Sequence, residues 1–386
     1  MEGGPFRSPS ASLTVAGYQP ALDGLRALAI TAVVAFHSAP DLLPGGWCGV
    51  DLFFVLSGFL ITSLLMQETD RFGSIKRLAF YARRALRLWP AFALVLLFCI
   101  VIALGSKNPK NGLESVAMSG LYLMNWNRAY AWFPEIALGH TWSLAMEEQF
   151  YLVWPFLLSI FLPRRPLAWT LGLIAAVLAL RVAMVSAGAS IERIYNGFDT
   201  HSDGLLIGAA LAIVNIRHPK AVPWLAKAAL VIAPIAIILL AVPVETKYVD
   251  SFGLTIVAIV SASLVVLGMT SRIAEGILSL GFLRYTGKIS YGWYLWHMPV
   301  LSLGLHHLKG GLPLVSALAV ASYSIAALSY HFVERPILRL KARFSPLSGE
   351  QRPTDGDPGS NDPLPHAVAA MQTIAGHPPR PAVQRP

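Results

Sequence analysis

The stretch LDGLRALAITAVVAFH, residues 22–37, carries an arginine and a histidine within one apolar segment. On an α-helix, the eleven positions from Arg26 to His37 turn through about 1100°, which is within about 20° of whole turns. The two side chains therefore share one face, roughly 16 Å apart along the axis, and Asp23 lies near the same stripe. Two interpretations stay open for this helix alone. Either it binds a group at one end and reacts it near the other, or Arg26 snorkels to the membrane interface and His37 caps the far end.

The composition is typical of a membrane protein. The 386 residues are 55% hydrophobic and 13% charged, with a mean hydropathy of +0.57. Soluble domains carry about 25% charged residues. We therefore predict an all-α integral membrane protein with about ten transmembrane helices. By hydropathy and length these lie at about 21–39, 48–66, 86–105, 143–162, 167–187, 203–216, 223–243, 252–270, 288–308 and 312–332.

The distribution of positive charge predicts the topology. The net charge is +9, and a cytoplasmic N-terminus places eighteen Lys and Arg residues on the cytoplasmic side and six on the opposite side. By the positive-inside rule, both termini are then cytoplasmic. The basic balance reflects this topology, so we expect no nucleic-acid partner.

The two ends of the chain differ from its middle in composition. Residues 1–19 form a polar lead, and residues 20–343 hold the predicted transmembrane domain. Residues 344–386 are rich in Pro, Gly, Ser, Asp and Gln, which predicts a disordered cytoplasmic tail. Cys48 and Cys99 lie at different depths of separate segments, so we expect no disulfide between them. We also expect no metal site, because no Cys/His cluster has ligand spacing.

Charged residues inside the other apolar segments are candidate site residues. Arg83, Arg84 and Arg87 are three or four positions apart and cluster on one helical surface. They are either a collar that meets lipid head groups or an anion site. Glu147 and Glu148 lie about one turn into an aromatic helix, and an intramembrane acid indicates function by default. Interfacial acids are the alternative.

Four further features carry a weaker signal. Ser57 stands beside a glycine that fits ordinary close helix packing. Asp203 stands at the mouth of the short sixth segment, and His297 lies roughly 13 Å along its helix from a lysine. A lone histidine on an aromatic helix is more often a packing residue than a ligand. The loop 106–141 is long and partly apolar, and it can form a re-entrant or interfacial element that covers a site.

Seven blocks together resemble the membrane acyltransferase-3 family, the bacterial O-acetyltransferases of surface polysaccharides and related acceptors. They are LDGLRALAITAVVAFH, GVDLFFVLSGFLI, YARRALRLWP, HTWSLAMEEQFYLVWP, DTHSDGLLIGAALA, GKISYGWYLWHMP and FVERPILR. They follow the family order from about residue 20 to 343. The resemblance implies a ten-helix core that transfers an acyl group from cytoplasmic acyl-CoA to a hydroxyl at the outer face.

The resemblance also implies roles for particular residues. The family's Arg–His pair corresponds to Arg26 and His37, with His37 the catalytic candidate, and its acid corresponds to Glu147. The basic motif corresponds to Arg83, Arg84 and Arg87. His201 stands where many relatives carry arginine, so its role is open. Other residues that can line the site are Asp23, Asp51, Ser57, Glu148, Asp203 and His297.

The chemistry of acyl transfer fits these residue types. A hydroxyl attacks a thioester slowly unless a base removes its proton, and histidine suits that role near neutral pH. We expect His37 to be the base and Glu147 to orient its imidazole, with Asp51 the second choice. Arginine clusters bind phosphate, which suits the donor acyl-CoA, and Arg26 can hold its pantetheine arm. Direct transfer is favoured over an acyl-His37 intermediate, although the residues are compatible with both.

We therefore expect an acyl-CoA-dependent membrane O-acyltransferase in the bacterial cytoplasmic (inner) membrane. Its partners are the lipid bilayer, acyl-CoA (acetyl-CoA above all) and a hydroxyl acceptor on a surface glycan such as lipopolysaccharide or exopolysaccharide. One alternative acceptor is a small molecule such as a macrolide sugar. The alternative of another class is a transporter that uses the intramembrane Arg, His and Glu as a relay.

Overall fold

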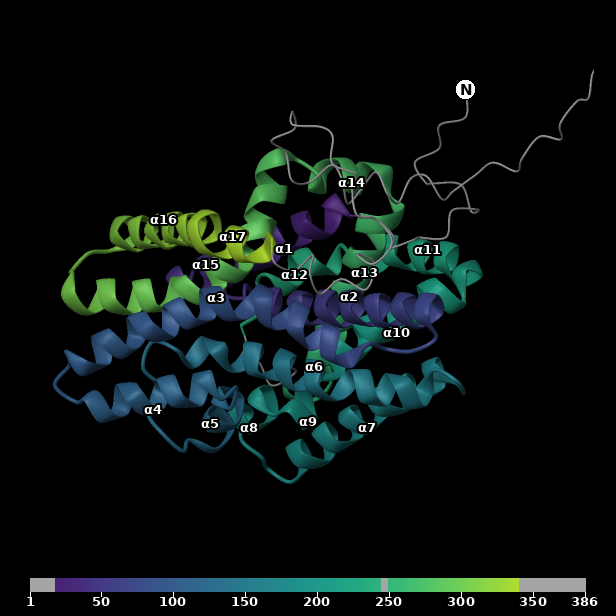
Figure 1. The fold of residues 1–386 in the computed structure, drawn as a ribbon, viewed down its shortest axis with the longest axis horizontal. Coiled ribbons are helices and arrows are strands. Elements are labelled where there is room, and N and C mark those ends of the chain that lie inside the picture. Colours follow the sequence, from purple (N-terminus) through teal and green to yellow (C-terminus); the bar gives the residue numbers. More distant parts are fainter. Residues whose placement is uncertain (1–17, 244–248, 340–386) are drawn as a thin grey trace, which may run out of the picture.

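The structure, a computed structural model, describes residues 18–243 and 249–339 of the chain. Within these residues every regular element is helical and no strand occurs. Figure 1 shows the long helices lying side by side, with the short α4 and α5 against one end of them. The all-α prediction is confirmed. The predicted tail at 344–386 and nearly all of the polar lead lie outside the described residues.

Nine helices of fifteen or more residues form the body of the described chain. They are α1 (Pro20–Ser38), α2 (Cys48–Phe72), α3 (Arg77–Leu104), α6 (Trp142–Phe161), α7 (Pro166–Ser186), α10 (Asp203–Arg217), α13 (Leu254–Thr270), α15 (Gly281–His307) and α16 (Leu312–Ser329). Shorter helices join them: α4 (Pro109–Gly120), α5 (Met124–Tyr130), α8 (Ile191–Asn196), α9 (Phe198–His201), α11 (Val222–Ile232), α12 (Ile235–Leu239), α14 (Arg272–Leu278) and α17 (Arg335–Leu338). Single turns of other helix types lie at η1 (Gly139–Thr141), η2 (Pro219–Ala221), η3 (Val249–Gly253) and η4 (Tyr330–Glu334).

Six of the described helices are long and apolar enough to cross a membrane. These spans are Pro20–Ser38, Cys48–Phe72, Arg77–Leu104, Pro166–Ser186, Ser251–Thr270 and Leu312–Leu338. A seventh is added if α10 and the helices after it, bent by 107°, count as one broken span. Helices also occupy the other predicted segments, as α6, α10, α11 with α12, and α15. The chain is thus a multi-helix membrane protein, while the count of about ten and the side of each terminus stay predictions.

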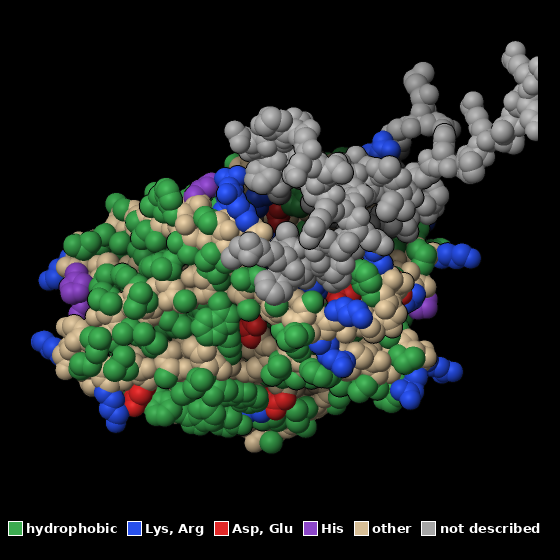
Figure 2. All heavy atoms as spheres, viewed as in Figure 1, with side chains coloured by type: hydrophobic (Ala, Val, Ile, Leu, Met, Phe, Trp, Pro, Cys, Tyr) green, Lys and Arg blue, Asp and Glu red, His purple; other side chains and the backbone are tan. Residues whose placement is uncertain are grey.

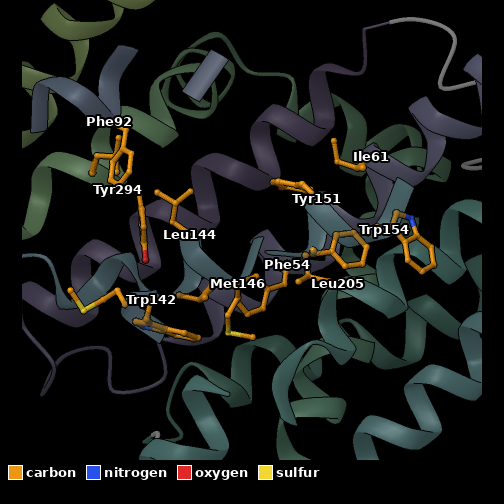
Figure 3. Close-up of a cluster of buried hydrophobic side chains, with 14 of the residues drawn as sticks. Phe54, Ile61, Phe92, Trp142, Leu144, Met146, Tyr151, Trp154, Leu205 and Tyr294 are labelled. Atoms are coloured by element: carbon orange, nitrogen blue, oxygen red, sulfur yellow. The ribbon is translucent and has the colours of Figure 1, made fainter. Parts of the chain in front are cut away.

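The surface and the core agree with a membrane setting. Hydrophobic side chains cover much of the face in Figure 2. Inside, aromatic and aliphatic side chains from helices far apart in sequence form one large cluster, in which Phe54, Trp142 and Trp154 are buried (Figure 3). The indole of Trp154 donates to Thr62 Oγ1 at 2.8 Å, so its polar atom is satisfied. Cys48 and Cys99 are both free thiols in the structure.

Glycines set the closest helix crossings. A Cβ atom on Gly58 of α2 would lie 1.9 Å from the Leu205 carbonyl oxygen of α10. In return, a Cβ atom on Gly208 of α10 would lie 2.1 Å from the Val55 carbonyl oxygen of α2. The two backbones therefore touch, as small residues allow in membrane helices. This confirms the close packing that we predicted at Gly58.

One such crossing builds the functional region. A Cβ atom on Gly287 of α15 would lie 1.9 Å from the Asp23 carbonyl oxygen of α1. From this crossing the two helices run in the same direction, and their later turns bring His37 beside His297. The predicted stripe of α1 and the lone histidine of α15 thus belong to one interface.

Candidate functional site

Two cavities lie along α1, one near each of its ends. The first has a volume of about 390 Å³, and its polar lining is Tyr18, Asp23, Arg26, Ser57, Arg84, Arg87, Ser143, Glu147, Tyr151, Lys288, Ser290, Tyr291, Tyr294, Tyr330 and Glu334. The second has a volume of about 470 Å³ and is lined by His37 with Arg128, Glu135, His140, Glu192, Tyr195 and Asn196, among others. Val50 and Tyr294 line both cavities, so they form the wall between them. The predicted shared face of Arg26 and His37 therefore opens into one cavity at each end.

Four basic side chains line the first cavity, namely Arg26, Arg84, Arg87 and Lys288. The Arg26 guanidinium lies 3.4 Å from the Asp23 carboxylate. Arg84 stacks over the ring of Tyr151 at 3.6 Å and lies 3.6 Å from the Glu148 carboxylate. The side chain of Arg87 is exposed to the cavity, and within the described residues no carboxylate forms an ion pair with it. A guanidinium that is exposed to a cavity and forms no ion pair there is suited to bind an anionic group.

Acids and phenols lie among these cations. Glu147 accepts a hydrogen bond from the Tyr151 hydroxyl at 2.8 Å, and Ser57 lines the same cavity. Tyr18 donates to the Asp23 carboxylate at 2.7 Å, and burial together with that bond raises the pKa of Tyr18 well above its usual range. The hydroxyl therefore stays protonated at neutral pH and keeps Asp23 in place.

The last helical turns of the described residues add a side chain to the first cavity that the sequence analysis did not single out. Glu334 is buried at the end of η4 and accepts from the Ser329 hydroxyl at 3.3 Å. Lys288 and Tyr330 line the first cavity with it. The only sequence signal for Glu334 was its charge inside FVERPILR, a block that the resemblance already included.

Arg83 does not line the first cavity. Its guanidinium forms an ion pair with Glu68 at 2.9 Å, which ties α3 to α2. The three arginines of the predicted cluster therefore do not share one environment. Arg84 and Arg87 face the cavity, whereas Arg83, one residue from Arg84, faces the neighbouring helix.

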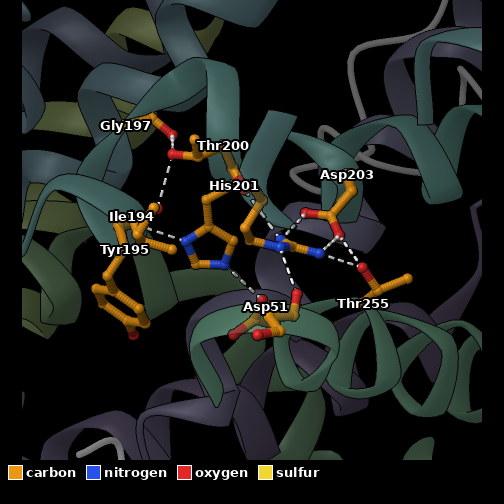
Figure 4. Close-up of polar contacts among 10 residues, drawn as sticks. Asp51, Ile194, Tyr195, Gly197, Thr200, His201, Asp203 and Thr255 are labelled. Atoms are coloured by element: carbon orange, nitrogen blue, oxygen red, sulfur yellow. Dashed lines mark hydrogen bonds and ion pairs between the residues drawn. The ribbon is translucent and has the colours of Figure 1, made fainter. Parts of the chain in front are cut away.

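Of the three aspartates predicted to line the site, Asp23 lines the first cavity, whereas Asp51 and Asp203 lie in a buried polar network (Figure 4). Asp51 accepts from His201 Nε2 at 3.0 Å, while Nδ1 of the same ring donates to the Tyr195 carbonyl at 2.7 Å. Asp203 accepts from both terminal nitrogens of Arg181, at 3.1 and 2.8 Å. Every one of these ionic side chains has zero exposure. Asp51 is therefore held by His201 and does not meet His37.

Three imidazoles meet at the inner end of the second cavity. His37 Nδ1 lies 3.0 Å from the Val33 carbonyl oxygen and 3.3 Å from His297 Nε2, and His297 Nδ1 lies 2.6 Å from the Tyr294 carbonyl oxygen. A carbonyl can only accept, so both Nδ1 atoms carry the hydrogen. His297 Nε2 then accepts from His37, and the lone pair of His37 stays on Nε2. This tautomer is the one that a general base at this cavity needs.

The carboxylate predicted to orient His37 is not its neighbour. Glu147 lies in the first cavity with Tyr151, whereas the described partners of the His37 ring are Val33 and His297. The Val33 carbonyl oxygen and the His297 imidazole are therefore the groups that contact His37 Nδ1. The sequence contained His297, but not its pairing with His37 across 260 residues.

His140 is the third imidazole. It begins the block HTWSLAMEEQFYLVWP, but it was not among the predicted site residues. Its ring lies 5.0 Å from that of His297 and 5.2 Å from that of Tyr294, measured between centroids. Burial, followed by the neighbouring His37, lowers the pKa of His140 to about 3, so this ring is neutral at neutral pH. The Tyr294 hydroxyl bonds both the His140 carbonyl and, at 2.6 Å, the Ser143 hydroxyl. These bonds hold Tyr294 in the wall between the cavities.

The loop 106–141 covers the second cavity, as the sequence suggested. Arg128 of α5 donates to Asn196 at 3.0 Å and to Glu135 at 2.7 Å, and all three side chains line the cavity. Polar side chains from both α5 and α8 therefore line the second cavity. In the part of the chain that the structure describes, no three His, Cys, Asp or Glu side chains are grouped to hold a metal ion.

The chain is similar in sequence to a known family and to several curated proteins. The family model described as an acyltransferase domain matches residues 19–331. The peptidoglycan O-acetyltransferase OatA of Listeria monocytogenes is 36% identical over 348 residues, or 83% of this chain and 56% of that protein. A putative O-acetyltransferase of Staphylococcus aureus, SAS0844, is 34% identical over 346 residues, or 83% of this chain and 57% of that protein. The putative peptidoglycan O-acetyltransferase YrhL of Bacillus subtilis is 33% identical over 348 residues, or 83% and 55%.

The chain thus spans little more than half the length of the curated relatives that it matches. No solved structure matches it.

Proposed function

Because the chain belongs to the acyltransferase-3 family, we propose that it transfers an acyl group, acetyl in the first instance, from cytoplasmic acyl-CoA to a hydroxyl of a cell-envelope glycan. The observation that carries the proposal is the pair of cavities along α1, which share a wall at Val50 and Tyr294. A donor and an acceptor can enter from opposite ends and meet at that wall. The names of the relatives support a glycan acceptor, and peptidoglycan is the first to test.

The first cavity is the proposed donor site. Arg87, Arg84 and Arg26 supply permanent positive charge that suits the phosphates of acyl-CoA. The phenol rings beside them give the pantetheine arm an apolar surface. The thioester then lies beside Tyr294, which lines both cavities and so borders the cavity of His37 as well. Arg83 has no part in this site because it is paired with Glu68.

The second cavity is the proposed acceptor site, with His37 as the general base. Nε2 of His37 takes the proton of the acceptor hydroxyl while the hydroxyl oxygen bonds to the thioester carbonyl carbon. The carbon–sulfur bond breaks, and the proton returns to the departing thiolate of coenzyme A. This direct transfer needs no acyl-enzyme intermediate.

His297 is the proposed positioning residue for this step. By accepting from His37 Nδ1 it holds the ring in the tautomer that leaves Nε2 as the base. When Nε2 takes a proton, the Val33 carbonyl and His297 Nε2 remain as acceptors that stabilise the imidazolium. An imidazole and a carbonyl thus take the place that a carboxylate has in other histidine-assisted acyl transfers.

The proposed setting is the bacterial cytoplasmic membrane, with about ten spans and both termini in the cytoplasm. The excess of Lys and Arg at one set of helix ends supports this orientation. It puts the first cavity, at the N-terminal end of α1, towards the cytoplasm, where acyl-CoA is found. His37, at the C-terminal end of α1, then faces outward.

The test is transfer of label from radiolabelled acetyl-CoA to peptidoglycan glycan in proteoliposomes. His37→Ala is expected to lower kcat by about two to four orders of magnitude, the usual contribution of a general base. His306→Ala is the matched control, because His306 is exposed at the end of α15 and lines neither cavity. Full activity of His37→Ala would refute His37 as the base.

His297→Gln tests the positioning role separately. It is expected to lower kcat with little change in the KM for either substrate, since His297 touches His37 and not the donor cavity. A change confined to KM would mean that His297 binds substrate directly.

A transporter is the second candidate, because two cavities in line across a thin wall also suit alternating access. Uptake of a labelled compound without acyl-CoA, unaffected by coenzyme A analogues, would favour it. Within the enzyme class, label entering a small molecule such as a macrolide sugar, with none in glycan, would change the acceptor.

A further inference from the structure

Three aromatic rings form a parallel stack beside the second cavity. The rings of Trp126 and Tyr130 lie 6.0 Å apart at 16°, and those of Tyr130 and Trp132 lie 5.8 Å apart at 14°. We call these three residues the aromatic stack. Tyr130, the middle ring, is 54% exposed and Trp132, the outer ring, is 51% exposed, so about half of each of these side chains is open to a ligand.

The backbone holds the outer ring in place. Ala131 has a φ of 51°, in the left-handed region that a residue with a Cβ rarely adopts, and this ends α5 and turns Trp132 onto Tyr130. The buried Asn127 side chain donates to the Phe133 carbonyl at 3.1 Å and accepts from the Phe133 amide at 2.9 Å. The turn is thus fixed from inside by a reciprocal pair of hydrogen bonds. Such conformations are typical of functional sites.

Arg193 ties the stack to the rim of the cavity. Its guanidinium carbon lies 5.3 Å from the ring of Trp126 and 5.5 Å from that of Tyr130. Its Nε also donates to the Tyr130 hydroxyl at 3.1 Å, and its terminal nitrogen pairs with Asp199 at 2.6 Å. Arg193 belongs to α8, and α5 and α8 are the helices that supply Arg128 and Asn196 to the second cavity. The stack and the acceptor cavity are therefore built from the same two helices.

A pyranose ring is the ligand that this surface fits. One face of a pyranose carries C–H groups that pack flat on an aromatic ring, while its hydroxyls point outward to hydrogen-bonding partners. The aromatic stack offers parallel rings, and the partly exposed Asp199 carboxylate, paired with Arg193 at 2.6 Å, offers an acceptor at their edge. Tryptophan and tyrosine also form belts at membrane interfaces. A belt requires neither parallel rings nor a fixed turn, so the geometry favours a sugar.

We propose that the aromatic stack is a glycan-binding subsite that holds sugar units of the acceptor next to those entering the second cavity. This inference rests on the proposed function for the identity of the acceptor, but its binding site is separate from His37. The stack makes the enzyme select an extended glycan over a single sugar, because an extended glycan contacts both the cavity and the stack, which does not line that cavity.

The test uses the full chain in lipid nanodiscs and a tetramer of β-1,4-linked N-acetylglucosamine as the probe. Titration calorimetry measures its Kd, and label from acetyl-CoA measures its KM. Trp132→Ala is expected to raise both by about three- to tenfold, the range of one aromatic contact. Trp132→Phe keeps a ring and is expected to recover most of the binding. Trp224→Ala is the control, since Trp224 is 72% exposed with Lys227 over its ring at 5.0 Å, but lies on α11 and lines neither cavity.

The outcomes separate this inference from the proposed function. Binding of the tetramer that weakens in Trp132→Ala supports the subsite even if the wild type transfers no acyl group, a result that would overturn the proposed function alone. Unchanged Kd and KM in Trp132→Ala, with acyl transfer intact, would overturn the subsite. A variant that only inserts poorly into membranes, with the same Kd once purified, would make Trp132 a membrane-belt residue and also overturn it.

Discussion

The substitution Asp203→Asn tests whether this aspartate is structural or part of the site. Asp203 lines neither cavity along α1, and its two carboxylate oxygens face the two terminal nitrogens of Arg181. Asparagine keeps the shape of the side chain. It removes the negative charge and turns one accepting oxygen into a donor that faces another donor. Arg181 then stays buried without a counter-charge.

The size of the effect follows from the contacts. Breaking a buried ion pair costs about 3–5 kcal/mol of unfolding free energy. Arg181 keeps three other acceptors in the variant, the Ser251 carbonyl at 2.7 Å, the Thr200 carbonyl at 3.0 Å and the Thr255 hydroxyl. These bonds solvate part of the orphaned charge, so we expect the lower end, about 3 kcal/mol. That is a large share of the roughly 5–15 kcal/mol that stabilises a typical protein.

The assay is unfolding of the purified protein in lipid, with activity measured on the surviving folded fraction at low temperature. Asp70→Asn is the matched control, because Asp70 pairs with Arg217 at 2.6 Å but both side chains are more than 40% exposed. We expect less than about 1 kcal/mol there. For Asp203→Asn we expect reduced stability with an unchanged kcat per folded molecule.

Two results would refute this reasoning. Equal stability losses in the two variants would mean that the Arg181 pair contributes no more than an exposed one. A loss of kcat at unchanged stability would return Asp203 to the site that the sequence suggested.

Three further predictions follow from the same structure. Arg87→Gln is expected to raise the KM for acetyl-CoA by about ten- to a hundredfold, the value of a charged hydrogen bond; a pantetheine donor without the nucleotide phosphates should show no such rise. Burial opposes the charging of His201, but the charge and hydrogen bond of Asp51 favour it more strongly, so the pKa of His201 is raised. The resulting stability is complete below the ordinary value of 6.5 and is lost as pH rises through the raised pKa, so unfolding measured against pH should be steeper above 6.5 in the wild type than in His201→Asn. Gly58→Val is expected to cost at least about 1–3 kcal/mol in thermal unfolding, because its Cβ meets α10 backbone at 1.9 Å, whereas Gly172→Val, with no atom within 4 Å, should keep most of the stability.

The local pattern of the sequence was sufficient to predict the helical segments and the face of α1 that carries Arg26 and His37. Apolar length predicted where helices form, and the structure places a helix at each predicted segment. The 3.6-residue period predicted that Arg26 and His37 share a face, and each opens into one of two cavities along α1. Both properties depend on residues close together in the chain, so they can be predicted from the sequence.

The partners of the charged groups could not be predicted in this way. Asp51 lies 150 residues from His201, and His37 lies 260 residues from His297. Nothing in the local pattern says which helices will touch, and for this reason the sequence did not predict that His297, and not Glu147, contacts the His37 ring.

What the sequence alone determined was therefore the class of protein, its helical segments and the spacing of Arg26 and His37. Tertiary structure decided which carboxylate meets which cation, which imidazole contacts His37 and that the His140 ring lies beside that of His297. The physical reason is that helix formation depends on neighbours three or four residues apart. The pairing of buried polar groups depends on which helices pack together, and here close crossings at residues such as Gly58 and Gly287 fix that packing.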